Sequence, residues 1–89
     1  MSRYLAFDPN GWEDYQHWQA HDRNILKRVN KLIQDALRDP ASGIGKPERL
    51  KYGSELPTYS RRVTAEHRLV YQLSGDYLVV IQARFHYDD

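Results

Sequence analysis

Apolar residues change their spacing along this 89-residue chain, from a helical period in the first half to alternation in the last third. Between residues 22 and 38 they recur at i, i+3, i+4 and i+7, which predicts a long amphipathic helix. Asp22 is suited to cap its start, and the helix should end near Pro40, because proline disfavours helical geometry in the preceding residue. The apolar positions are Ile25, Leu26, Val29, Leu32, Ile33, Ala36 and Leu37.

An aromatic first segment precedes this helix. Residues 3 to 7 predict a short strand, and Asp8 followed by Pro9 predicts the start of a first helix, with aspartate as the N-cap and proline at the first helical position. Trp12, Tyr15 and Trp18 recur every three residues along this helix. We expect this aromatic stripe to lie in the core, with the two helices forming a hairpin against a sheet.

The second half of the chain predicts a glycine- and proline-rich loop followed by strands. Residues 40–58 read as a loop with one brief strand near residues 48–50, and loops of this length in compact domains are usually functional. Three strands follow, at residues 59–63, 67–73 and 77–85. The expected fold class is therefore α+β, a small antiparallel sheet packed on one face by a two-helix N-terminal hairpin.

The register of the last hairpin decides which side chains share a face, because side chains alternate along a strand. A two-residue turn would mix apolar and polar residues on each face. A three-residue turn that pairs Leu73 with Tyr77 gathers the apolar residues, including Phe85, on the face that the helices cover. We therefore expect the three-residue turn, which leaves Arg68, Arg84 and His86 on the uncovered face.

Composition limits the classes of protein. With 40% hydrophobic and 28% charged residues, residues 1–89 fit one ordinary folded domain. The chain has no cysteine, no signal-peptide pattern and no long apolar run, so we expect a cytoplasmic protein without a membrane segment. His17 and His21 have a spacing that could chelate a metal from one face, but no third ligand accompanies them. We expect surface histidines, no metal site and no cofactor.

Positive charge gathers around the loop and the strands, although the formal net charge is only +1. Residues 38–68 hold seven basic and four acidic residues, an excess of three positive charges. Solvated surface charges would explain this window alone. A basic sheet face beside a glycine-rich loop that carries Glu48 instead indicates a site for a phosphodiester.

The residue types on this face match metal-free RNA cleavage. That reaction needs a base for the 2′-hydroxyl proton, a cation for the charge on phosphorus and an acid for the departing 5′ oxygen. Glu48 is the candidate base, Arg68 the phosphate clamp and His86 the acid, with Tyr87 positioning the phosphate or stacking on a base. Each residue taken alone fits an ordinary surface role better than a catalytic one, and it is their convergence that favours the functional interpretation.

Several motifs resemble the Txe/YoeB toxins of the RelE/ParE superfamily. The resemblance runs through nearly the whole chain in the same order, and the block at residues 66–71 is specific to the family. The motifs are Trp12-Glu13-Asp14-Tyr15, Trp18, Gly43-Ile44-Gly45-Lys46-Pro47-Glu48, Ser60-Arg61-Arg62, Glu66-His67-Arg68-Leu69-Val70-Tyr71 and Arg84-Phe85-His86-Tyr87.

The resemblance implies a RelE-like fold, similar to microbial ribonucleases, and a ribosome-dependent mRNA endoribonuclease acting as the toxin of a type II toxin-antitoxin pair. It implies Glu48 as general base, Arg68 as transition-state stabiliser, His86 as general acid and Tyr87 as positioning residue. The implied partners are a YefM/Phd-like antitoxin, the ribosome with its mRNA, operator DNA through the antitoxin complex, and a second copy of the chain, because the family often dimerises. The expected RNA-binding residues are Lys46, Lys51, Arg61, Arg62 and Arg84.

The chain departs from the family pattern in three places. Arg49 stands where the family usually has proline after the glutamate, the loop at residues 54–59 is rebuilt, and Asp88-Asp89 extend past the usual terminal tyrosine. Two further functions therefore stay open. The protein could bind and block a target without cleaving RNA, or it could be a regulatory partner that only binds an antitoxin and operator complex.

Overall fold

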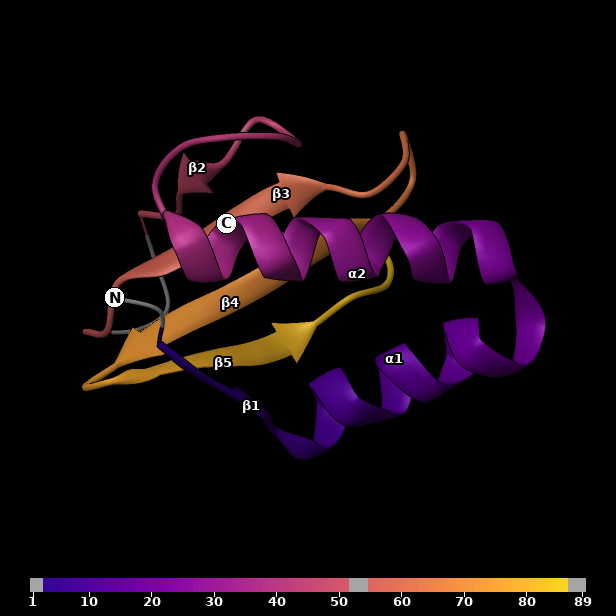
Figure 1. Cartoon of the computed structure of the whole chain (residues 1–89), viewed down its shortest axis with the longest axis horizontal. Coiled ribbons are helices and arrows are strands. Elements are labelled where there is room, and N and C mark those ends of the chain that lie inside the picture. The colour runs from indigo at the N-terminus through magenta and orange to yellow at the C-terminus, as the bar shows by residue number, and fades with distance from the viewer. Residues whose placement is uncertain (1–2, 52–54, 87–89) are drawn as a thin grey trace.

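Two helices lie on one face of a five-stranded sheet in the computed structural model (Figure 1). The structure describes residues 3–51 and 55–86, and the α+β class predicted from the sequence is confirmed. In chain order the elements are β1 (Tyr4–Phe7), α1 (Pro9–His21), α2 (Arg23–Arg38), β2 (Glu48–Arg49), β3 (Thr58–Arg62), β4 (Arg68–Ser74) and β5 (Tyr77–Gln82).

The sheet is mixed, whereas the sequence predicted an antiparallel one. Its strand order is β1-β5-β4-β3-β2, so the first and last strands of the chain are neighbours (Figure 1). β1 pairs with β5 in parallel, because the chain leaves β1 into the two helices and returns through the other strands. The remaining pairs are antiparallel, as predicted.

Both helices begin at the aspartates predicted as caps. The Asp8 carboxylate accepts a hydrogen bond from the Gly11 amide at 2.7 Å, and the Asp22 carboxylate accepts from the amides of Asn24 and Ile25. Side-chain oxygens thereby satisfy amides that lack a partner in the first turn. α2 ends at Arg38, two residues before Pro40, as predicted.

The core lies between the helices and the sheet, and it contains only part of the predicted aromatic stripe. Trp18 is buried and Tyr15 packs against the core, but Trp12 is 47% exposed, so its predicted burial is wrong. Trp12 lies against Phe7 and Tyr15 at the rim of the core. The buried core side chains are Trp18, Val29, Leu32, Ile33, Ala36, Val63, Leu69, Tyr71, Leu78, Val80 and Ala83.

Neither helix in the described part of the chain has the length and apolar character that a membrane-spanning helix needs.

The turn between β4 and β5 has two residues, so the predicted pairing of Leu73 with Tyr77 is wrong. Ser74 pairs with Tyr77 and Leu73 with Leu78. The register then shifts between Val70 and Tyr71, so that one extra residue of β5 is left without a partner. Such a bulge reverses the alternation of side chains partway along the strand. The apolar residues still reach the core, but by a route that simple alternation does not reveal.

Helix α1 continues the edge of the sheet where β1 ends. Asn10 and Trp18 donate hydrogen bonds to the carbonyls of Ile81 and Ala83, at 2.8 and 2.7 Å. The Asp14 carboxylate accepts from the Ala83 amide at 3.0 Å. Burial raises the pKa of Asp14, against the effect of this amide. Side chains spaced four residues apart on α1 thereby take the place of a neighbouring strand.

A buried arginine joins α2 to the sheet. The Arg61 side chain has no exposed surface and makes five hydrogen bonds. It bonds the Asp35 carboxylate at 2.6 Å and the Tyr71 hydroxyl at 2.9 Å. Burial raises the pKa of Tyr71, whose hydroxyl donates to the Pro40 carbonyl at 2.6 Å. The other acceptors of Arg61 are the carbonyls of Asp39, Ser42 and Ile44.

Replacing Gly11 by alanine should destabilise the fold. A methyl group at this position would overlap the Val80 carbonyl of β5, which is backbone and cannot turn away. Alanine in a helix normally gains about 1 kcal/mol over glycine. We expect Gly11→Ala instead to lower the free energy of unfolding by about 2 kcal/mol, measured by urea denaturation. The exposed Gln16→Ala should change it by less than about 0.5 kcal/mol. A stabilised Gly11→Ala variant would contradict the close packing.

Asp35→Asn should make the free energy of unfolding vary less with pH in the acid range. Hydrogen bonds from Arg38 and Arg61 hold the pKa of Asp35 far below its usual range. A lowered folded-state pKa contributes stability above the unfolded value of about 4, and this contribution is lost as pH falls through the folded-state pKa. We expect Asp35→Asn to be less stable at pH 7, with a difference from wild type that shrinks below about pH 4. Urea unfolding across pH tests this, with Asp76→Asn as the control. A pH-independent difference would contradict the ion-pair explanation.

Candidate functional site

The predicted base lies in a row of side chains on the sheet face opposite the helices. Glu48 pairs with Ser60 of β3, Ser60 with Val70 of β4, and Val70 with Gln82 of β5. Residues directly opposite each other in antiparallel strands share a face, so this row crosses four strands on one side. The face is not bare, since Ser60 and Val70 are buried. They form its floor between Glu48 at one end and Gln82 at the other.

Two arginines form the next row on the same face. Arg62 of β3 pairs with Arg68 of β4, and successive side chains on one face of a strand lie about 7 Å apart. The Arg62 side chain is exposed and that of Arg68 is half-buried. Like charges directly opposite each other destabilise a pair of strands. An anion bound between them would remove this cost, so the pair favours a phosphate site.

The C-terminal segment that carries His86 follows the end of β5. The side-chain nitrogen of Gln82 lies 2.8 Å from the Arg84 carbonyl oxygen, and 3.2 Å from those of Phe85 and His86. These three backbone carbonyls around one side-chain amide keep this segment next to the end of the Glu48 row. The His86 side chain is exposed. Tyr87 lies outside the described residues.

Phe85 has a role different from the one predicted. The sequence placed it in the core, yet its side chain is 58% exposed and its φ is +65°, in the left-handed region that non-glycine residues seldom adopt. Both of its backbone groups are bonded to the start of β4. The Phe85 amide donates to Nδ1 of His67 at 2.8 Å, and the Phe85 carbonyl accepts from the Arg68 amide at 3.0 Å.

Arg61 was predicted to bind RNA, and the structure contradicts this prediction. Its side chain is buried and all of its hydrogen bonds go to the protein, so it cannot reach RNA. Arginine has five N–H donors, and the interior acceptors use them all. The neighbouring Arg62 is exposed, because alternation points it to the other face. Lys46 and Lys51 are also exposed.

Arg84 does not follow the predicted strand alternation, because β5 ends at Gln82. Its guanidinium carbon lies 4.5 Å from the centre of the Phe85 ring, a cation–π arrangement. Desolvation raises the pKa of Asp14 and lowers the pKa of His17, and the nearby positive charge of Arg84 acts to lower both. The prediction that it faces the open side together with Arg68 is therefore not supported by the strand geometry.

The site spans four strands of the sheet. Three strand spacings, about 14 Å, separate the backbone at Glu48 from that at Gln82, and both long side chains shorten the gap. A carboxylate at one end, an imidazole near the other and arginines in the adjoining row are the groups that acid-base cleavage of a phosphodiester requires. The same groups could also bind an anion without reaction.

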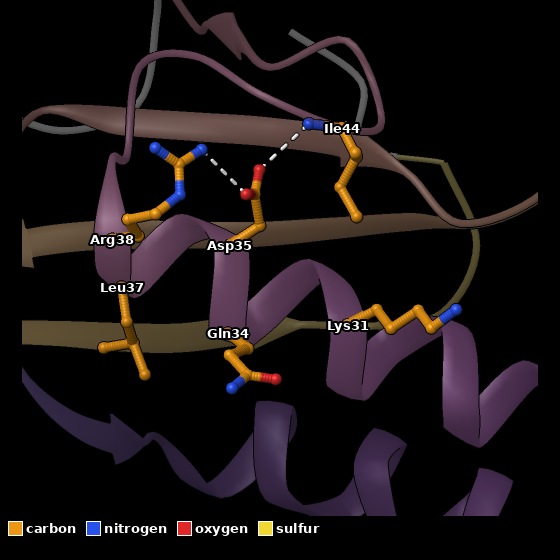
Figure 2. A pocket seen from close by; sticks show the side chains of 6 residues that line it. All are labelled: Lys31, Gln34, Asp35, Leu37, Arg38 and Ile44. Carbon is orange, nitrogen blue, oxygen red and sulfur yellow. Dashed lines mark hydrogen bonds and ion pairs between the residues drawn. The ribbon is translucent and has the colours of Figure 1, made fainter.

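An open hollow lies elsewhere, on the outer side of α2 (Figure 2). The Asp35 carboxylate sits in it and accepts hydrogen bonds from Arg38 and from the Ile44 amide, at 2.9 Å each. None of the predicted catalytic residues that the structure describes lines this hollow, so we assign it no part in the site. Its lining residues are Lys31, Gln34, Asp35, Leu37, Arg38 and Ile44.

Sequence reasoning missed two side chains that shape the site. Gln82 and His67 hold the C-terminal segment, but both contacts depend on the chain turning back after β5. The signal available in the sequence was a polar residue next to the Arg84-Phe85-His86-Tyr87 motif.

For metal binding, no three His, Cys, Asp or Glu side chains within residues 3–51 and 55–86 could hold an ion together. His17 and His21 instead stack on each other with ring centres 4.3 Å apart.

Comparison with known proteins gives consistent results. Residues 7–87 match the family described as the YoeB-like toxin of bacterial type II toxin-antitoxin systems. A toxin YoeB of Streptomyces coelicolor is 52% identical over 93% of this chain and 98% of its own length. The YoeB/ParE toxin from Agrobacterium tumefaciens has a TM-score of 0.85 at 48% identity, covering 94% of this chain and 99% of that one.

Two structures from Staphylococcus aureus are also similar. A YoeB dimer has a TM-score of 0.86 at 36% identity, and a YoeB–YefM complex has 0.81 at 37% identity. Each alignment covers 98% of this chain and 100% of the other. The family match spans most of the chain, and the relatives are matched over nearly their full length. The chain therefore belongs to the YoeB-like toxin family of bacterial type II toxin-antitoxin systems.

Proposed function

We propose that this toxin is a ribosome-dependent mRNA endoribonuclease, acting as one domain over residues 1–89. The observation that carries the proposal is the sheet register, which puts Glu48 and Arg68 on the same face, beside the segment that bears His86. Family membership agrees with a toxic activity of this kind. Cleavage by these groups needs neither a metal nor a cofactor.

The proposed reaction is a transfer within the RNA followed by strand release. Glu48 takes the proton of the 2′-hydroxyl, whose oxygen attacks the adjacent phosphorus. Arg68 stabilises the negative charge that gathers on the phosphate oxygens. His86 gives a proton to the departing 5′ oxygen, so that a 2′,3′-cyclic phosphate and a free 5′-hydroxyl result. Tyr87 positions the phosphate or stacks on a base.

Exposed cations next to this row would hold RNA. Arg62 lies in the row of arginines next to the Glu48 row. Lys46 precedes β2 in the chain and Lys51 follows it. Phosphate contacts of this type position RNA without reading its sequence. Arg84 stays a candidate contact, with its guanidinium stacked on Phe85. Arg61 is excluded from this group by its burial.

The proposed partner is an antitoxin of the YefM/Phd type. A YoeB–YefM complex is known from Staphylococcus aureus, and that toxin is similar to this chain over its whole length. A segment of the antitoxin that covers the Glu48 row would block access of RNA, and the complex would bring the toxin to operator DNA. The dimer known from the same organism makes self-association a further proposal.

Removing the proposed base or acid should abolish cleavage without unfolding the protein. We expect Glu48→Gln and His86→Gln each to lower kcat by about 10²- to 10⁴-fold, because each loses a proton transfer in the transition state. The measurement is mRNA cleavage on purified ribosomes, with cut sites mapped at nucleotide resolution.

Glu13→Gln and His21→Gln are matched controls, since both side chains are exposed on α1, on the other side of the sheet. They should keep wild-type activity. Unchanged cleavage by the double variant of Glu48 and His86 would refute the proposal. Growth arrest with intact mRNA would favour the alternative, a toxin that binds and blocks its target without cleaving it.

The adjacent arginines of β3 should separate RNA binding from stability. Arg62→Gln should weaken ribosome binding and reduce its salt dependence by about one unit of slope, with a stability equal to or slightly above that of wild type, because it removes a like charge opposite Arg68. Arg61→Gln should lower the free energy of unfolding by about 3 kcal/mol, because the carboxylate and carbonyls around it lose their donors. Binding titrations at several salt concentrations and urea denaturation measure the two effects. Equal loss of stability in both variants would contradict the assignment.

A further inference from the structure

We propose that His67 is a positioning residue for the reaction, whose neutral imidazole fixes the segment that carries His86; this inference rests on the proposed function. Nothing in the catalytic scheme requires His67. Its Nδ1 nonetheless accepts the Phe85 amide hydrogen bond at 2.8 Å, immediately before His86 in the chain.

The backbone at Phe85 needs an external restraint. A left-handed conformation costs a non-glycine residue about 1–2 kcal/mol, and it persists only where surrounding contacts hold it. The φ of Phe85 is +65°, and its ring is 58% exposed, so burial in the core does not supply the restraint. Its ring is 5.9 Å from that of His67 and meets the Arg84 guanidinium on its face. The directional contacts of its backbone therefore set the conformation.

Two of those contacts come from consecutive residues of the chain, while the Gln82 side chain also donates to the Phe85 carbonyl at 3.2 Å. His67 receives the Phe85 amide hydrogen, while the Arg68 amide donates to the Phe85 carbonyl at 3.0 Å. The start of the strand that carries the proposed phosphate clamp and the segment with the proposed acid are thus joined through the backbone of one residue, Phe85. Loss of the bond to His67 would free one side of Phe85 and let the His86 imidazole move relative to Arg68.

The imidazole ring of His67 is itself held in place. It meets Trp18 edge-on, with ring centres 4.8 Å apart, and Trp18 is fixed by its own bond to the Ala83 carbonyl. His67 Nδ1 can accept a hydrogen bond only while it carries no proton, which places the proton of the neutral ring on Nε2. Trp18 therefore orients the His67 ring, and Nδ1 of that ring orients the segment that contains Phe85 and His86.

Two substitutions distinguish this positioning from a general packing role. Asparagine places its amide oxygen at the same number of bonds from Cβ as Nδ1, so His67→Asn keeps the acceptor. Leucine has a similar shape and no acceptor. We expect His67→Leu to lower kcat about tenfold with KM within about twofold, the size expected for one lost hydrogen bond. His67→Asn should stay within about threefold of wild type.

A direct measurement of the bond separates this inference from the proposed function. In the full-length wild-type protein, NMR should detect a scalar coupling across the hydrogen bond between the Phe85 amide nitrogen and His67 Nδ1. Exchange of the Phe85 amide hydrogen with solvent should be about tenfold faster in His67→Leu than in wild type or His67→Asn.

Equal activity loss in both variants, or absence of the coupling in the wild-type protein, would overturn the inference. The coupling needs no variant, so it decides the question even if His67→Leu fails to fold. A detected coupling together with a wild-type protein that cleaves no mRNA would overturn the positioning role of His67 along with the proposed function. Cleavage that depends on Glu48 and His86 but not on the acceptor at position 67 would overturn this inference alone.

Discussion

The buried guanidinium of Arg61 joins α2, the loop that follows it and β4 to β3. Removing a charged group from water costs several kcal/mol unless acceptors replace the water molecules. Here Asp35 of α2, Tyr71 of β4 and three carbonyls of the connecting loop do so. The same arrangement requires glycine at position 43, since any side chain there would overlap the Asp35 carboxylate. The loop leads directly into β2, so the position of Glu48 depends on a contact made on the opposite face of the sheet.

The two ends of the site are held in different ways. Glu48 and Arg68 belong to strands whose register is anchored by the core and by Arg61. His86 belongs to a segment without buried apolar contacts of its own, held by hydrogen bonds from Gln82 and through Phe85. Regions with few apolar contacts open more easily than core strands. The proposed base and phosphate clamp therefore lie on strands of the sheet, whereas the proposed acid lies on a segment held by a few hydrogen bonds.

The sequence predicted the elements better than it predicted where individual side chains lie. Periodicity and aspartate caps determine α1 and α2, because those signals are local. The β4–β5 register was wrong because a bulge reverses alternation, and nothing in the local pattern marks it. Arg61 and Arg62 look equivalent in sequence, yet alternation sends one into the interior and the other to solvent. The family motif indicated Glu48, Arg68 and His86, whereas the contacts of Gln82 and His67 depend on tertiary geometry.

The replacement of a strand by α1 along β5 also affects association between chains. A free strand edge presents unpaired amides and carbonyls that can recruit another polypeptide. Along the end of β5, Asn10, Asp14 and Trp18 occupy these groups with side chains that no incoming strand can displace without unpacking the helix. Within residues 3–51 and 55–86, the outer strands are β1 and β2, with four and two residues. The sheet thus offers very short templates for edge-to-edge growth, which limits the formation of fibrils from the folded state.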